Sequence, residues 1–275
     1  MRHESGFLDV DGGRIYWEAS GEGHPLLLIH AGVADLRMWD AQVPSWAERY
    51  RVVRYDTRGF GRTESEAVPF SNRADALAVL DHAAARPAYV LGISRGGSIA
   101  LDVALEAPDA VDGLVLVAPG LGGMEEVSTP EEHAAFEEME KAFEAGDMDA
   151  LIELEVRLWA DGPGQPPERI DPALRQRMRE FGRSNYLPPR PEPAAQPLQP
   201  PAAGRLGEVS VPTVVMVGDL DASGVQEAAS RIADGVAGAG LVAFPGVAHM
   251  VNLEQPEAFT RAVLEFLAEV DAARD

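Results

Sequence analysis

The chain has 275 residues, enough to bury a large hydrophobic core without disulfides or bound metals. It contains 23 Lys and Arg against 45 Asp and Glu, and the net charge of −22 excludes nucleic acid and anionic membrane surfaces as main partners, because both need a basic face. Cysteine is absent, which excludes thiolate metal sites and cysteine nucleophiles. No aliphatic run approaches the ~18 residues of a membrane span and no secretory leader is visible, so we expect a cytoplasmic protein.

Short apolar runs alternate with helix-like segments over the first 120 residues. Continuous apolar runs are typical of strands that are buried on both faces. Their alternation with helices indicates a mainly parallel sheet with helices on both of its faces. The predicted strands are residues 7–10, 14–18, 26–29, 52–55, 88–91 and 111–117, and the predicted helices are residues 42–50, 72–85 and 95–107.

The alternation of strands and helices stops between residues 121 and 205. Residues 121–162 carry thirteen acids and two bases in a helical, amphipathic pattern. Residues 187–201 contain seven prolines, which exclude a regular helix or a central strand and predict an extended connector.

After residue 205 the alternation resumes, with strands predicted at 213–217 and 241–244 and helices at 226–236 and from Pro256 onward. We therefore predict one α/β core, residues 1–120 and 206–275. It is interrupted by a helical cap, residues 121–205, which ends in a proline-rich return segment.

A candidate nucleophile lies in residues 92–96, Gly-Ile-Ser-Arg-Gly, which fit the pattern G-x-S-x-G with Ser94 at the centre. The motif directly follows the predicted strand 88–91 and opens the predicted helix 95–107, the setting that a nucleophile elbow requires. Glycines on both sides permit the tight turn and the strained backbone of such a serine. The alternative interpretation is a glycine-rich strand-to-helix turn with a capping serine.

A serine hydroxyl needs a general base, and His249 is the best-placed histidine of the six. It lies between the last predicted strand and the last predicted helix, at the sheet edge where α/β proteins carry working residues. An orienting carboxylate could come from Asp219 or Asp221, which both follow the predicted strand 213–217. Other histidines lie near the terminus, in a turn or on polar helix faces: His3, His24, His82 and His133.

The chain order of Ser94, an aspartate and His249 resembles the α/β-hydrolase superfamily, and the resemblance spans nearly the whole chain outside the insertion. It implies a mainly parallel α/β-hydrolase sheet flanked by helices, with an inserted helical cap. In that family the acid is commonly the third residue after the glycine that ends the strand. The resemblance therefore favours Asp221 as the triad acid and leaves Asp219 as a turn or capping residue.

Two further segments resemble motifs of this family. Residues 30–39 resemble its His-Gly-type oxyanion loop, although an alanine stands at position 31. This implies that the backbone N–H groups of Gly32 and Arg95 bind the developing oxyanion, and that His30 is a buried hydrogen-bonding residue. Residues 56–63 resemble the D-x-R-G-x-G-x-S turn, which implies a structural bend fixed by glycines and an ion pair.

The identity of the nucleophile separates the branches of the superfamily. A serine argues against haloalkane dehalogenases and epoxide hydrolases, which use an aspartate. The resemblance therefore implies a serine esterase or lactonase, in which Ser94 attacks the carbonyl, His249 transfers the proton and Asp221 orients the imidazole. Three alternatives stay open: a cofactor-free perhydrolase or haloperoxidase, a proline iminopeptidase-like peptidase, and a non-catalytic ligand receptor.

We expect the insertion to form a lid that sets substrate choice. Trp159, Leu158 and Met139 are candidate pocket-lining residues, with a role in the core as the alternative. The acidic residues 121–162 predict that anionic substrates are disfavoured. We expect no cofactor or metal, because no glycine array has a nucleotide-binding spacing and no histidines and carboxylates cluster at metal-ligand spacing. The expected partner is a small-molecule ester or lactone, and the expected assembly is a monomer or homodimer.

Overall fold

The computed structural model describes residues 3–125, 127–187, 191 and 194–274. Its central sheet has the strand order β1-β2-β4-β3-β7-β8-β10-β11, with β5 paired to β2. β1 and β2 form an antiparallel hairpin and β2 pairs antiparallel with β4, whereas every pairing from β4 to β11 is parallel. The strands are β1 (His3–Val10), β2 (Gly13–Ser20), β3 (His24–Ile29), β4 (Tyr50–Tyr55), β5 (Glu64–Ser65), β6 (Pro69–Phe70), β7 (Ala88–Ile93), β8 (Val111–Val117), β9 (Ala194–Ala195), β10 (Thr213–Gly218) and β11 (Gly240–Phe244).

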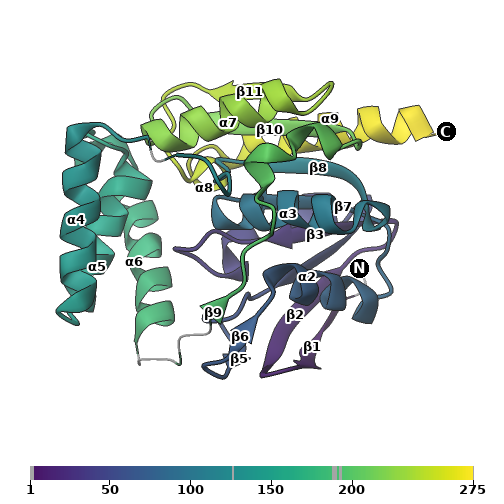
Figure 1. Ribbon diagram of the computed structural model, residues 1–275, viewed down its shortest axis with the longest axis horizontal. Coiled ribbons are helices and arrows are strands. Elements are labelled where there is room, and N and C mark those ends of the chain that lie inside the picture. The colour runs from purple at the N-terminus through teal and green to yellow at the C-terminus, as the bar shows by residue number, and fades with distance from the viewer. Residues whose placement is uncertain (1–2, 126, 188–190, 192–193, 275) are drawn as a thin grey trace.

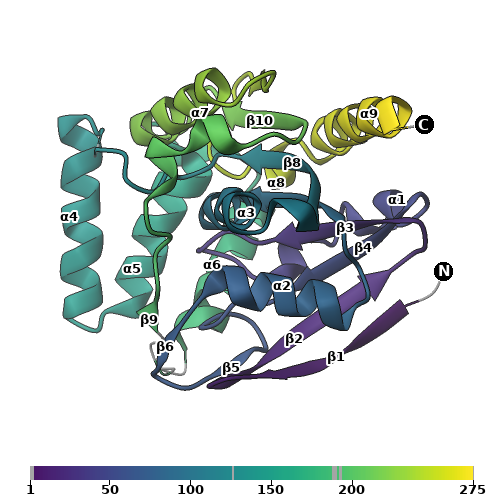
Figure 2. The same cartoon turned by 45° about the vertical axis from the view of Figure 1, so that its right-hand side comes forward.

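Helices cover both faces of the sheet, which confirms the predicted fold class. One face carries α2, α3 and α7, and the other carries α1, α8 and α9 (Figures 1 and 2; α1 is labelled in Figure 2). The α-helices of the described ranges are α1 (Val43–Trp46), α2 (Asn72–His82), α3 (Arg95–Glu106), α4 (Pro130–Glu144), α5 (Met148–Glu155), α6 (Pro172–Tyr186), α7 (Ser223–Gly235), α8 (Val251–Glu254) and α9 (Pro256–Arg274). None of these helices is both long enough and apolar enough to cross a bilayer.

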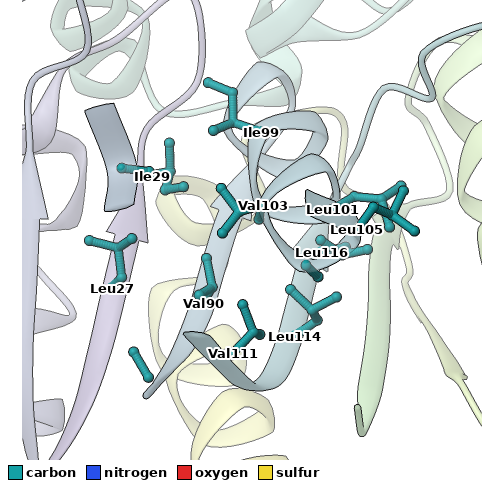
Figure 3. Close-up of a cluster of buried hydrophobic side chains, with 14 of the residues drawn as sticks. Leu27, Ile29, Val90, Ile99, Leu101, Val103, Leu105, Val111, Leu114 and Leu116 are labelled. Atoms are coloured by element: carbon teal, nitrogen blue, oxygen red, sulfur yellow. The ribbon is translucent and has the colours of Figure 1, made fainter. Parts of the chain in front are cut away.

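The core forms because successive strand residues point to opposite faces of the sheet. In β3, Leu27 and Ile29 pack under α2 and α3, whereas Leu26 and Leu28 pack on the other face. Figure 3 shows the first of these clusters, where side chains of α3 interdigitate with those of β3, β7 and β8. Each fully buried aliphatic side chain contributes roughly 1.5–3 kcal/mol, so this core holds the strand ends in fixed positions.

The insertion forms a separate helical layer at one end of the sheet. α4, α5 and α6 stand side by side there, as both views show (Figures 1 and 2). A π-helical turn, Val156–Asp161, follows α5. The proline-rich connector, part of which lies outside the described residues, pairs through β9 with β6 in a small two-stranded sheet. This contact fixes the return segment against the core.

Two predicted boundaries differ from the structure for physical reasons. The helix predicted over 42–50 is shortened to α1, because Tyr50 pairs with His24 as the first residue of β4 and the chain must leave the helix before it. The helix predicted over 226–236 begins earlier, at Ser223, whose N–H donates to the carboxylate of Glu132 in the insertion (2.8 Å). That capping partner comes from a distant segment.

Candidate active site

Ser94 occupies a strained turn between β7 and α3. Its backbone angles are φ 55° and ψ −119°, a combination that costs a non-glycine residue about 1–3 kcal/mol. The neighbouring glycines make the turn possible, since a Cβ at Gly92 would lie 2.0 Å from the carbonyl oxygen of Gly96. A Cβ at Gly96 would lie 2.3 Å from the carbonyl oxygen of Ile29. The turn is therefore built to hold a side chain at the carboxyl edge of the sheet.

Asp221 and His249 form a buried pair at the same edge. The Nδ1 atom of His249 lies 2.8 Å from Oδ2 and 3.0 Å from Oδ1 of Asp221, and the two residues are 2% and 4% exposed, respectively. A carboxylate on Nδ1 selects the tautomer that carries its proton there and leaves Nε2 free to accept one. Asp219 is exposed and accepts the N–H of Gly246 (2.7 Å), so it caps the loop that leads to His249.

The topology explains why residues so distant in sequence share this edge. Ser94 follows β7, Asp221 follows β10 and His249 follows β11, and these strands run parallel in one sheet. Their carboxyl ends therefore meet at one edge. Among the described residues Ser94 and His249 share no hydrogen bond, and catalytic hydrogen bonds of this kind often tighten only when substrate binds.

The two predicted oxyanion residues contact each other through the side chain of Arg95. Arg95 is the first residue of α3, so its N–H has no acceptor within the helix. Gly32 packs against the Arg95 side chain, because a Cβ at Gly32 would lie 3.6 Å from the Arg95 Cδ. The N–H of Ala31 is directed to the sulfur of Met38 (3.3 Å), which leaves Gly32 as the next donor in the loop.

His30 is fully buried and holds the oxyanion loop to the turn at residues 56–63. Its Nε2 accepts the N–H of Thr57 (3.0 Å), and its Nδ1 donates to the carbonyl of Ala31 (2.7 Å). Burial lowers the pKa of His30 to about 4, and the nearby Arg95 charge adds to this effect. His30 is therefore neutral and occupied by structural hydrogen bonds.

The turn at residues 56–63 is held by two separate carboxylates. Asp56 accepts the N–H groups of Leu36 (2.8 Å) and Arg62 (2.7 Å), and burial raises its pKa to about 7. Arg58 pairs with Asp75 of α2 through two hydrogen bonds of 2.8 and 2.9 Å. The ion pair of this motif therefore joins the turn to a helix.

The three candidate pocket residues of the insertion have different surroundings. Trp159 lies on the π-helical turn, with its ring centroid 4.5 Å from that of His249. Leu158 is buried and lines a cavity of about 450 Å³ within the insertion, together with Leu154 and Arg157. Met139 is half-buried on α4 and lines neither this cavity nor the one beside Arg95. Of the three, the structure brings only Trp159 to the candidate site.

Sequence reasoning missed Arg169, which ties the insertion to the histidine loop. Its guanidinium donates to Glu254 Oε2 (2.6 Å) and to the carbonyls of Gly246 (2.8 Å) and Ala160 (2.6 Å). Glu254 in turn accepts the N–H of Ala248, the residue before His249 (2.9 Å). The sequence carries no local signal for this network, because its members come from separate segments.

Sequence reasoning also missed Glu132, which joins α4 to the loop after Asp221. One carboxylate oxygen accepts the N–H of Ser223 (2.8 Å), and the other accepts the N–H of Thr129 (2.7 Å) and contacts the Ser223 hydroxyl. The spacing Thr-x-x-Glu is a capping-box signal that predicts the contact with Thr129. This spacing does not predict the contact between Glu132 and Ser223.

The described residues include no group of three or more His, Asp and Glu side chains placed to hold a metal ion. The groups present at the site are a serine in a strained turn and an imidazole oriented by a carboxylate, with Gly32 and Arg95 as the predicted N–H donors. These are the elements of nucleophilic acyl transfer.

Comparison with known proteins places this arrangement in a family. The model of the alpha/beta hydrolase family matches residues 26–262. The chain belongs to that family. Membership supports a hydrolytic activity.

Individual relatives are moderately similar to the chain. It is 28% identical to "Putative carbamate hydrolase RutD" of Agrobacterium fabrum, over 90% of this chain and 94% of the relative. Among solved structures, a hydrolase from Pseudomonas aeruginosa is 28% identical, with a TM-score of 0.75 over 96% of this chain and 98% of the other. Est816, described as an N-acyl homoserine lactone degrading enzyme, is 26% identical, with a TM-score of 0.75 over 95% of this chain and 100% of the other.

Proposed function

We propose that this alpha/beta hydrolase cleaves a carboxylic ester or lactone through an acyl-enzyme formed on Ser94. The observation that carries the proposal is the buried contact between His249 and Asp221 at the sheet edge where Ser94 is held in a strained turn. A buried carboxylate on Nδ1 prepares an imidazole to work as a base through Nε2. If Ser94 only capped a glycine-rich turn, the turn would need neither His249 nor Asp221 beside it.

The proposed reaction has two halves. Ser94 Oγ attacks the carbonyl carbon while His249 Nε2 takes its proton, and the negative charge on the carbonyl oxygen is bound by the N–H groups of Arg95 and Gly32. The intermediate expels the alcohol, which receives the proton from His249. Water then attacks the acyl-enzyme with His249 as base, which releases the acid and restores Ser94.

Two observations support ester or lactone substrates over peptides. Est816, a structural relative, is described as a lactone-degrading enzyme, which supports the same chemistry here. A peptidase that recognises a free amino group needs unpaired acids in its cap. In the insertion, however, Glu153 is paired with Arg175 (2.7 Å) and Arg179 (2.8 Å) of α6.

The test is turnover of p-nitrophenyl esters of graded acyl length and of a panel of lactones, with Ser94→Ala as the matched variant. The proposal expects hydrolysis by the wild type and a loss of at least about 10³-fold in the variant, which keeps its circular dichroism spectrum and its melting temperature. Equal turnover by both proteins would contradict it. Absence of turnover on every ester and lactone would favour a receptor, and bromination that requires peroxide and acetate would favour a perhydrolase.

A further inference from the structure

A cavity of about 610 Å³ lies between the core and the insertion and reaches the nucleophile elbow at Arg95. On the core side it is bounded by the turn that contains Phe60 and by Phe70 of β6. On the insertion side it is bounded by Phe143, near the end of α4, and by Tyr186, at the end of α6. The cavity is therefore aromatic along its length, and its wall includes the cationic side chain of Arg95, the residue that follows Ser94.

The guanidinium of Arg95 has an unusual environment for a partly buried charge. Its Nη2 donates to the hydroxyl of Thr57, and the group stacks on the Phe60 ring at 4.5 Å. The Nε atom is enclosed and has no hydrogen-bond partner. No carboxylate of the described residues forms an ion pair with Arg95, and burial lowers its pKa to about 10.

A buried charge without a partner is costly, because water is removed and nothing replaces it. Other charges of the cavity do not offset that of Arg95. Arg58 is neutralised by its two hydrogen bonds to Asp75, and Glu144 is exposed to solvent. Among the described residues, Arg95 therefore leaves one positive charge without an ion pair in the cavity wall, which matches a single carboxylate better than a phosphate dianion.

We propose that the Arg95 side chain is the binding subsite for a carboxylate carried by the acyl group of the substrate. This inference rests on the proposed function, since it takes the substrate attacked by Ser94 to extend into the cavity that Arg95, the next residue, lines. The substrate class is an ester or lactone whose acyl part ends in a carboxylate. The aromatic walls suit the apolar chain between the two ends.

The acidic sequence of the insertion predicts that anionic substrates are disfavoured, whereas the subsite proposed here favours a carboxylate. Ion pairs within the insertion weaken the argument from its acidic sequence. Arginines of α6 lie against these acids: Arg179 is 2.8 Å from Glu153, and Arg183 is 3.4 Å from Asp149. The long-range field is thereby reduced. A carboxylate bound in the cavity would lie within hydrogen-bond reach of the Arg95 guanidinium. The attraction to this near charge outweighs the repulsion from the more distant acids of the insertion, which solvent and salt screen.

A matched pair of substrates tests the subsite: p-nitrophenyl hydrogen adipate and its methyl-capped diester, which lacks the negative charge. We expect the wild type to favour the acid by kcat/KM. In Arg95→Met, which keeps the backbone N–H, the ratio of acid to diester kcat/KM should fall by at least about tenfold. Arg95→Lys, which keeps the charge, should retain part of the preference. Arg231→Met removes an exposed arginine of α7, outside both the cavity and the insertion, and should leave the ratio unchanged.

A binding measurement separates this inference from the proposed function. Adipate should bind Ser94→Ala in a calorimetric titration, and its affinity should fall at least about tenfold in the double variant with Arg95→Met. Turnover of the diester without any preference for the acid would overturn the subsite and leave the proposed function standing. Adipate binding that depends on Arg95, without turnover of either ester, would support the subsite and overturn the proposed function. Adipate binding that is absent or insensitive to Arg95 would overturn the subsite.

Discussion

The indole ring of Trp159 lies 4.5 Å, centroid to centroid, from the imidazole ring of His249. One residue comes from the π-helical turn of the insertion and the other from the loop after β11. A π-helical turn contains one residue more than an α-helical one and rotates the side chains that follow it, and such turns are frequent at functional sites. The contact makes the insertion part of the wall around the proposed base.

Trp159→Ala should change which acyl chains are preferred, because it removes one wall of the space beside His249. We expect relative kcat/KM to shift toward longer or bulkier p-nitrophenyl esters, by about tenfold between the ends of the series. Met139→Ala, in the same layer but away from His249, is the control and should leave the order of chain lengths unchanged. An equal loss on every ester would show that Trp159 supports the base and does not select the substrate.

Asp221→Asn should be far more damaging than Asp219→Asn. Only Asp221 contacts His249, and the loss of the acid in such a triad costs ~10⁴ in turnover. Asp219 accepts one backbone N–H in the preceding loop, so its variant should lose less than about tenfold. Steady-state kinetics of both variants on one ester show which aspartate is the triad acid. A more severe loss in Asp219→Asn would assign that role to Asp219.

Arg169→Met should destabilise the protein and lower kcat together. The change leaves the buried carboxylate of Glu254 without its cation, which typically costs about 3–5 kcal/mol, and it loosens the loop that carries His249. Because Glu254→Gln removes the stranded charge, the double variant should recover part of the free energy of unfolding measured in urea. A single Arg169 variant with wild-type stability and kcat would show that the network does not position His249.

Glu155→Gln should stabilise the protein increasingly as pH rises from about 4.5 to about 7. Burial raises the pKa of Glu155 to about 7, with the Tyr186 hydroxyl as its hydrogen-bond donor (2.6 Å). Between the unfolded value near 4.5 and about 7 the native state holds more protons than the unfolded state. Stability therefore falls as pH rises through this window, by up to about 3 kcal/mol.

A glutamine at position 155 carries no charge and still accepts the hydrogen bond of the Tyr186 hydroxyl. The variant therefore avoids the loss of stability that follows ionisation of Glu155. Urea unfolding should give a small advantage of the variant at pH 5 and a clearly larger one at pH 8. Glu137→Gln is the control, because that side chain is 53% exposed. A difference that is the same at both pH values would rule out a titrating Glu155.

The sequence contains local signals for much of the core and for the candidate catalytic residues. Ser94, Asp221 and His249 each stand directly after a strand or in a loop beside one, and parallel strands bring such positions to one edge. Arg169 and Glu132 could not be found in this way. Their partners lie 85 and 91 residues further along the chain, and only the folded packing brings them together.

The side-chain contacts of the insertion could not be predicted from the sequence either. Apolar periodicity placed Trp159, Leu158 and Met139 on helices, but it does not distinguish a cavity wall from a core face. Leu158 and Trp159 are neighbours on the π-helical turn and point in different directions, so Trp159 reaches His249 while Leu158 packs inside the insertion. Neither the turn nor the salt bridges from α6 to the acidic helices has a local sequence signal.

Reaction with a fluorophosphonate, followed by intact-protein mass and peptide mapping, tests the central claim most directly. Such a reagent is attacked by an activated serine and leaves a stable phosphonyl adduct. The account predicts one adduct per chain, located on Ser94, no adduct in Ser94→Ala and strongly slowed labelling in His249→Gln. An unlabelled wild type, a label on another residue, or equal labelling of Ser94→Ala would contradict it.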